Sequence, residues 1–196
     1  MIKVLTTSEY MSFPKVLNYT DIRSYVFTVG LVFLAVFTPW VFHQFHLAGP
    51  TFLPMHIFVL LAGLLFGWRA GLAVGLFTPL ISYVISGMPV LAILPQIVVE
   101  LSVYGLALGI LRGKFNLRVI WSLIGAVIAG RLALLLAVSI IYVVGEIYSP
   151  LGVEANPLTV VWSVIKLGWT SIAIQLVSIP LIMKLIERLA LKNSHG

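Results

Sequence analysis

The fold is decided by the stretch from Ser24 to Trp68, which reads SYVFTVGLVFLAVFTPWVFHQFHLAGPTFLPMHIFVLLAGLLFGW and contains no Asp, Glu, Lys or Arg. About 20 apolar residues are enough to cross a bilayer as a helix, so this stretch is long enough for more than one span. Across the whole chain of 196 residues, 61% are hydrophobic and 9% are charged, whereas soluble domains carry about 25% charged residues. The sequence therefore predicts an integral membrane protein.

Six hydrophobic segments alternate with short polar turns or turns that contain Gly and Pro. The predicted helices cover residues 24–43, 55–68, 72–86, 90–111, 119–145 and 158–186. Residues 1–23 carry several charges and no continuous apolar run, so they are not typical of a cleaved signal peptide. We expect an all-α fold, a compact bundle of six transmembrane helices over 24–186, with a cytoplasmic segment at 1–23 and a basic cytoplasmic tail at 187–196.

The basic residues predict the orientation. If the six spans alternate, every Lys and Arg outside the hydrocarbon falls on one side of the membrane. These residues are Lys3, Lys15, Arg23, Arg69, Arg112, Lys114, Arg118, Lys184, Arg188 and Lys192. Loops on the other side carry Glu146 and Glu154. Because positively charged loops stay in the cytoplasm, both termini are predicted to be cytoplasmic. The net charge of +6 is thus interpreted as a membrane-orienting signal, with no nucleic-acid partner expected.

Several reaction classes lack the residues that they need. The chain has no Cys, which excludes disulfides and thiolate chemistry. Asp21 is the only Asp, so an intramembrane aspartyl pair or an aspartate-rich magnesium site is excluded as well. No phosphate loop is present, and ATP hydrolysis would have to come from a partner. We expect a non-catalytic protein without a cofactor.

Three ionisable residues, Glu100, Arg131 and Lys166, are predicted at membrane depth, where charged side chains are costly and by default functional. Two interpretations of Glu100 and Arg131 stay open: an ion pair that locks the fourth helix to the fifth, or direct contacts with a ligand. If they pair, Lys166 is a surplus cation. It would then face an outward cavity and suit a ligand with a carboxylate or phosphate.

The neighbours of Lys166 favour such a cavity. Trp162 and Trp169 lie at positions i−4 and i+3 on the same helical face, and Thr170 is close to it. Other polar side chains available for ligand contacts are Gln96, Tyr104 and Gln175. The alternative is that the two tryptophans belong to the interfacial aromatic belt of a membrane protein.

Three histidines, His43, His46 and His56, cluster around the first external loop. Their spacing is not typical of a metal site, and we expect none. Contacts to the loop or to the ligand are favoured instead, with His56 as the candidate ligand contact.

The segment FLPMHIFVLLAGLLFGWRAG at 52–71, with PLIS at 79–82 and GMP at 87–89, resembles the substrate-binding S components of energy-coupling factor (ECF) vitamin transporters. The resemblance is clearest over residues 49–112. In that family a short second helix with a Gly-rich end, a tight turn, a third helix with Pro and a Gly-Met-Pro external turn occur in this order.

The resemblance implies a subunit of a prokaryotic plasma-membrane transporter that captures a water-soluble vitamin or precursor from outside. Its partners would be a transmembrane scaffold subunit and two cytoplasmic ATPases. The ligand region would lie in the outer half of the bundle, under residues 44–54 and beside 87–90 and 146–157, which includes Asn156. Scaffold docking in the family uses small residues of the first helix, here Gly30 and Ala35, and Gly63 and Gly67 are further candidates for close helix approach.

Two buried cations against one buried anion would favour an acidic substrate such as pantothenate or a pterin or pyridine carboxylate. Two other functions stay open. A self-sufficient secondary transporter or channel would move its substrate without ATPase partners. A structural membrane subunit would bind no small ligand, and Glu100 and Arg131 would then only hold helices together.

Overall fold

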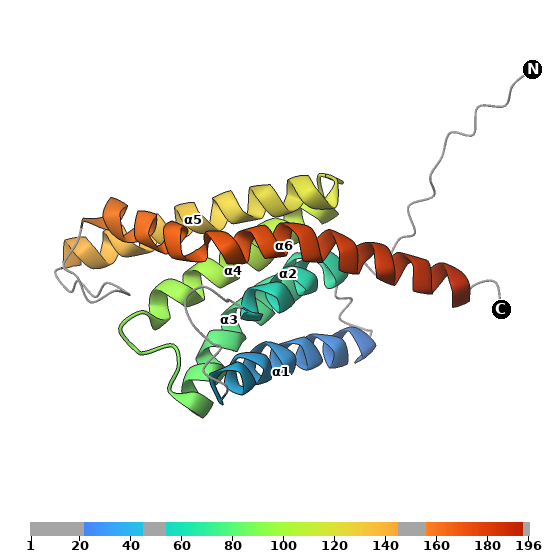
Figure 1. Cartoon of the computed structure of the whole chain (residues 1–196), viewed down its shortest axis with the longest axis horizontal. Coiled ribbons are helices and arrows are strands. Elements are labelled where there is room, and N and C mark those ends of the chain that lie inside the picture. Colours follow the sequence, from blue (N-terminus) through green and yellow to red (C-terminus); the bar gives the residue numbers. More distant parts are fainter. Residues whose placement is uncertain (1–21, 45–53, 145–155, 194–196) are drawn as a thin grey trace, which may run out of the picture.

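The computed structural model describes residues 22–44, 54–144 and 156–193, and the regular structure within them is entirely helical. The six helices shown in Figure 1 are α1 (Ile22–Gln44), α2 (Pro54–Phe66), α3 (Trp68–Ser86), α4 (Leu94–Gly113), α5 (Val119–Val144) and α6 (Pro157–Asn193). The predicted all-α fold with six helical segments is confirmed. Of the predicted N-terminal segment, residues 1–21 lie outside the described residues.

Three helix boundaries differ from the prediction by four residues or more: the start of α3, described below, the start of α4 and the end of α6. α4 begins at Leu94, since Pro95 lies in its first turn, where proline is tolerated because that N–H has no partner within the helix. α6 continues to Asn193, beyond the predicted end at residue 186. Residues 187–193 are mostly good helix formers, so the predicted tail begins as a continuation of the helix, while the apolar span itself ends at Ile186 as predicted. The cytoplasmic placement of the tail stays a prediction.

Two glycines with positive φ reverse the chain around α3. Gly67 has φ 84° and separates α2 from α3, so the turn predicted over 67–71 contracts to one residue and Trp68 already begins the helix. Gly87 has φ 69° and ends α3, with its N–H donating to the carbonyl of Tyr83 at 2.8 Å. A left-handed residue of this kind is a common helix end. The predicted turn at 87–89 is therefore confirmed.

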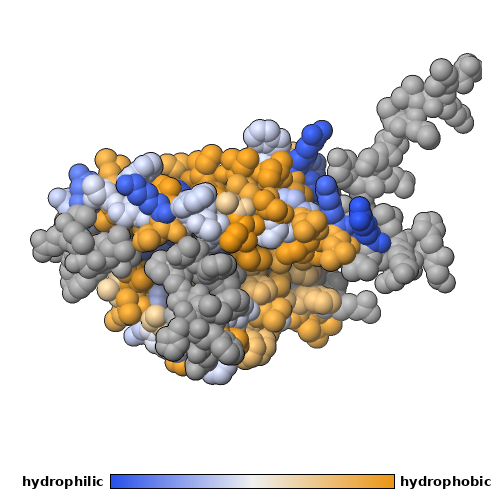
Figure 2. Space-filling view, in the orientation of Figure 1, coloured by the Kyte–Doolittle hydropathy of each residue, from blue (hydrophilic) through white to orange (hydrophobic). Residues whose placement is uncertain are grey.

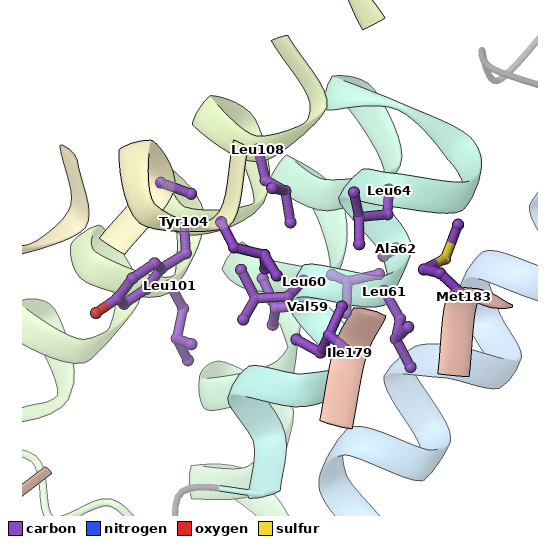
Figure 3. Packing of buried hydrophobic residues seen from close by; sticks show 13 residues of the cluster. Val59, Leu60, Leu61, Ala62, Leu64, Leu101, Tyr104, Leu108, Ile179 and Met183 are labelled. Atoms are coloured by element: carbon purple, nitrogen blue, oxygen red, sulfur yellow. The ribbon is translucent and has the colours of Figure 1, made fainter. Parts of the chain in front are cut away.

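Buried side chains of the short helix α2 pack among those of α4 and α6, as Figure 3 shows. The main core combines side chains of α2 to α6, including Val59, Leu60, Val74, Leu101, Leu108, Leu123, Ile179 and Met183. A smaller cluster joins Leu134 and Val138 of α5 to Val160 and Val161 of α6. α6 thus packs twice, near its start against α5 and near its end against α2, and runs along the whole bundle (Figure 1).

Small residues bring α3 and α4 into backbone contact. A Cβ on Gly71 or on Gly105 would overlap the backbone of the other residue, and a Cβ on Gly63 would lie 2.8 Å from the carbonyl oxygen of Gly105. These glycines therefore serve packing within the chain.

The predicted docking residues are corrected for the same reason. Gly63 and Gly67 are buried inside the bundle, and Ala35 is fully buried. Only Gly30 of the four is exposed, with open space where a Cβ would lie. A partner helix approaching α1 would meet Gly30 and not the other three.

The outer surface is apolar. Large hydrophobic side chains are exposed on five of the six helices and include Phe33, Phe77, Val99, Leu136 and Val177. Figure 2 shows hydrophobic residues across the middle of one face and hydrophilic residues toward its ends. α3, α4, α5 and the part of α6 up to Ile186 are long and apolar enough to cross a membrane, whereas α1 and α2 have shorter apolar segments, Tyr25–Val41 and Met55–Phe66.

These features indicate a multi-pass membrane protein. α1 begins and α6 ends at the same end of the bundle (Figure 1). The count of six spans and the cytoplasmic placement of both termini stay predictions.

Candidate functional site

Five of the predicted site residues form what we call the buried polar set: His56 of α2, Gln96, Glu100 and Tyr104 of α4, and Arg131 of α5. All five are buried. The three α4 residues are spaced by four, so they share one face of the helix. The sequence predicted these residue types at membrane depth, and the structure brings side chains from three helices together.

Direct contacts link four members of the set. Arg131 Nη1 lies 2.8 Å from Glu100 Oε1, and the Tyr104 hydroxyl donates a hydrogen bond to the Glu100 carboxylate. The edge of one ring faces the other between His56 and Tyr104, with 5.3 Å between the ring centroids. Of the two open interpretations, the ion pair between α4 and α5 is confirmed, while contact of the pair with a ligand stays a prediction.

The position of the Tyr104 ring depends on Gly130 of α5. A Cβ on Gly130 would lie 3.0 Å from Cε1 and Cζ of the Tyr104 ring, which is closer than carbon atoms normally approach. The absence of a side chain at Gly130 therefore lets the phenol pass beside α5 and reach Glu100.

The hydrogen-bonding capacity of Arg131 is not filled by the described residues. The ion pair through Nη1 lacks the alignment of a hydrogen bond, and Nε has no hydrogen-bond partner among the described residues. A guanidinium has five N–H donors, and a buried donor without an acceptor costs about 1–3 kcal/mol. A ligand with acceptor oxygens or nitrogens beside Arg131 would remove this cost.

Lys166 does not lie in an enclosed cavity among the described residues, contrary to the prediction. Trp162 is 58% exposed and Trp169 64% exposed, and Lys166 is exposed with its Nζ 5.6 Å from the centroid of the Trp162 ring. The three side chains share a face as predicted, but that face points away from the packed core, and Thr170 is half-buried at its edge. We call Trp162, Lys166 and Trp169 the α6 lysine face.

This placement also changes the charge argument. Among the described residues the buried cation is Arg131, and it is matched by Glu100. The surplus of buried positive charge that favoured an acidic substrate depended on Lys166 facing inward.

Asn156 lies at the start of α6 and acts as its N-cap. Its Oδ1 accepts from the N–H of Leu158 at 3.1 Å, and its carbonyl accepts from the Thr159 hydroxyl at 2.6 Å. These bonds engage Asn156 in the helix end, while ligand contact stays a prediction. His46 and most of the predicted external ligand loops, residues 45–53 and 145–155, lie outside the described residues.

Sequence reasoning missed two buried polar residues on α3. Thr78 and Ser82 lie on the same face as Gly71 and Gly75, at helical spacing. The helical spacing of Gly71 and Gly75 marks the packed face of α3, and extending this spacing along the sequence would have predicted that Thr78 and Ser82 are buried. Gln175, which was predicted, is buried and donates to the Ser171 hydroxyl at 2.9 Å within α6.

A protein-family model described as ECF transporter, substrate-specific component, matches residues 15–183. The match includes α1 to α5 and α6 except its end, and so extends well beyond residues 49–112. No curated protein and no solved structure matched the chain.

Proposed function

Because the chain belongs to the family of ECF transporter substrate-specific components, we propose that it captures a water-soluble vitamin or vitamin precursor for import across a prokaryotic plasma membrane. The observation that carries this proposal is the family match over residues 15–183. The apolar outer surface and the long apolar helices support a subunit embedded in the membrane.

The buried polar set is the proposed ligand site. Ionisable residues inside a membrane protein are expensive and usually functional, and this set joins three helices around a guanidinium with donors left over. His56 and Gln96 lie in the first turns of α2 and α4, which the predicted topology places toward the outside. Polar groups of the ligand would accept from Arg131 and meet Gln96 and Tyr104.

The proposed partners are a transmembrane scaffold subunit and two cytoplasmic ATPases. The chain has no phosphate loop of its own, so the energy for transport would come from these subunits. Of the predicted docking residues, Gly30 on the exposed side of α1 is the one that a scaffold helix could still contact. Gly30→Leu should weaken assembly with the scaffold without changing ligand affinity.

The experiment begins with purification of the full chain in detergent and identification by mass spectrometry of any small molecule that co-purifies. The recovered compound is then titrated back while the tryptophan fluorescence is followed. We expect a vitamin or precursor at close to one molecule per chain and a saturable response. An empty protein that ignores a panel of vitamins would contradict the proposal, and so would transport in proteoliposomes without ATPase partners.

Tyr104→Phe tests the site itself. This variant keeps the ring beside Gly130 and removes only the hydroxyl that donates to Glu100. In the proposed site this hydroxyl also accepts a hydrogen bond from the ligand, and the loss of about 0.5–1.5 kcal/mol should lower affinity by up to about tenfold. Tyr142→Phe, at an exposed position of α5, is the matched control and should bind as the unchanged protein does.

A further inference from the structure

Two lysines lie within the apolar segment of α6, which runs from Pro157 to Ile186. Lys166 and Lys184 are both exposed, and no charged residue lies between them in the sequence. They are separated by about five helical turns, which places them on the same face and about 27 Å apart. Since the hydrocarbon core of a bilayer is about 30 Å thick, this separation fits two lysines at its two boundaries.

The direction of the Lys166 side chain agrees with such a position. Its Nζ lies over the ring of Trp162, which is one turn nearer to the start of the helix at Pro157. The ammonium therefore extends along α6 toward the polar boundary, as lysines do when they bury an apolar stem and keep the charge near water. Trp162 and Trp169 are exposed on either side of it, as aromatic residues are at membrane interfaces.

No carboxylate of the described residues neutralises this ammonium. The acids in residues 22–44, 54–144 and 156–193 are Glu100, which pairs with Arg131, and Glu187, which lies about 32 Å further along α6. A cation at the edge of the hydrocarbon, held over one indole and followed by another, is complementary to an anion at the same depth. The phosphate of a phospholipid lies at that depth.

We propose that Trp162, Lys166 and Trp169 bind the headgroup phosphate of an anionic phospholipid in the leaflet that surrounds the Pro157 end of α6. The ammonium pairs with the phosphate, and the two indoles pack against the glycerol and the upper acyl chains. This site is separate from the buried polar set and does not depend on the identity of the vitamin or on the sidedness of the membrane.

The test uses nanodiscs of phosphatidylcholine with increasing amounts of phosphatidylglycerol whose acyl chains carry bromine, which quenches nearby tryptophans. The other tryptophans, Trp40, Trp68 and Trp121, are replaced by Phe so that only the α6 lysine face emits light. A single interfacial lysine favours anionic lipid by about fivefold. We expect brominated phosphatidylglycerol to quench at about one-fifth of the mole fraction that brominated phosphatidylcholine needs.

Three variants make the result specific. Lys166→Met should abolish the preference, Lys166→Arg should keep it, and Lys184→Met, on the same face at the other boundary, should leave it unchanged. Native mass spectrometry of the full chain with all its tryptophans provides a second measurement. It should show retained phosphatidylglycerol that is lost in Lys166→Met.

Equal quenching by the two lipids, or a preference that survives Lys166→Met, would overturn the proposal. The rival occupant is a carboxylate of the chain itself. If the double variant Glu146→Gln and Glu154→Gln raised the lipid preference severalfold, the ammonium would already be paired within the protein, which also contradicts a lipid site.

Discussion

The buried polar set and the α6 lysine face were predicted by the same rule and have different surroundings. Both contain a charged residue at an estimated membrane depth, yet Arg131 lies opposite Glu100 of a neighbouring helix, whereas Lys166 lies over a tryptophan of its own helix. Depth along a helix is set by sequence position alone. Which side of the helix a neighbouring helix covers depends on tertiary packing. This packing decides whether a charged residue lies inside the bundle or on its surface.

The largest effect should come from breaking the buried pair. Glu100→Gln leaves the Arg131 guanidinium buried without its anion, and loss of one partner of such a pair costs about 3–5 kcal/mol. We expect this loss in the free energy of unfolding, measured in detergent without ligand. Adding Arg131→Met to Glu100→Gln should restore most of it. If the double variant were as unstable as the sum of the single variants, the two residues would not be coupled.

The next largest effect on stability should distinguish glycines in close helix contacts from glycines with free space around them. Gly105→Ala places a methyl group where the backbone of Gly71 lies, and overpacking of this kind costs about 1–3 kcal/mol. Gly30→Ala, with open space at its Cβ, is the matched control and should slightly stabilise α1, because alanine favours a helix. Thermal unfolding of the two variants is the measurement. Equal melting temperatures would show that the close approach of α3 and α4 carries little stability.

A smaller effect is expected at the start of α6, which supports the lysine face. Asn156→Ala removes the acceptor of the Leu158 N–H and should cost about 1 kcal/mol, as N-cap losses do. Asn156→Ser keeps a capping oxygen and should unfold like the parent. If both variants lost ligand affinity with unchanged stability, Asn156 would be a ligand contact, as the sequence predicted.

The smallest effect should follow Lys166→Met. An exposed lysine without an acidic partner among the described residues contributes little to folding, so the free energy of unfolding in detergent should stay within about 0.5 kcal/mol of the parent. Comparing the free energies of unfolding of Lys166→Met and Glu100→Gln therefore gives the sharpest contrast between the two regions. A loss as large as that of Glu100→Gln would mean that Lys166 is buried and paired.

The sequence predicted the helices well because each signal was local. The long run without charge at 24–68, the glycines at positions 67 and 87 and the prolines that follow the turns act within a few residues. The ion pair was one of two readings, since glutamate and arginine on adjacent helices have few other partners. The orientation of Lys166 could not be predicted, because Trp162 and Trp169 at its helical spacing fit an enclosed cavity and an interfacial belt equally well.

The corrected docking residues show the same limit. Gly63 and Gly67 carry the spacing of a close helix contact, but the spacing does not say whether the other helix belongs to the same chain. Gly105 of α4 occupies the place next to Gly63. Only the packing of α2 between its neighbours reveals that this contact is internal.

The most direct test compares ligand affinity in Tyr104→Phe and in Lys166→Met, using the compound recovered from the purified protein. The two regions are then probed in one titration series. A ligand held by the buried polar set predicts binding weaker by up to about tenfold for Tyr104→Phe and an unchanged dissociation constant for Lys166→Met. Loss of affinity in Lys166→Met with normal binding by Tyr104→Phe would contradict this account and return the ligand site to the α6 lysine face.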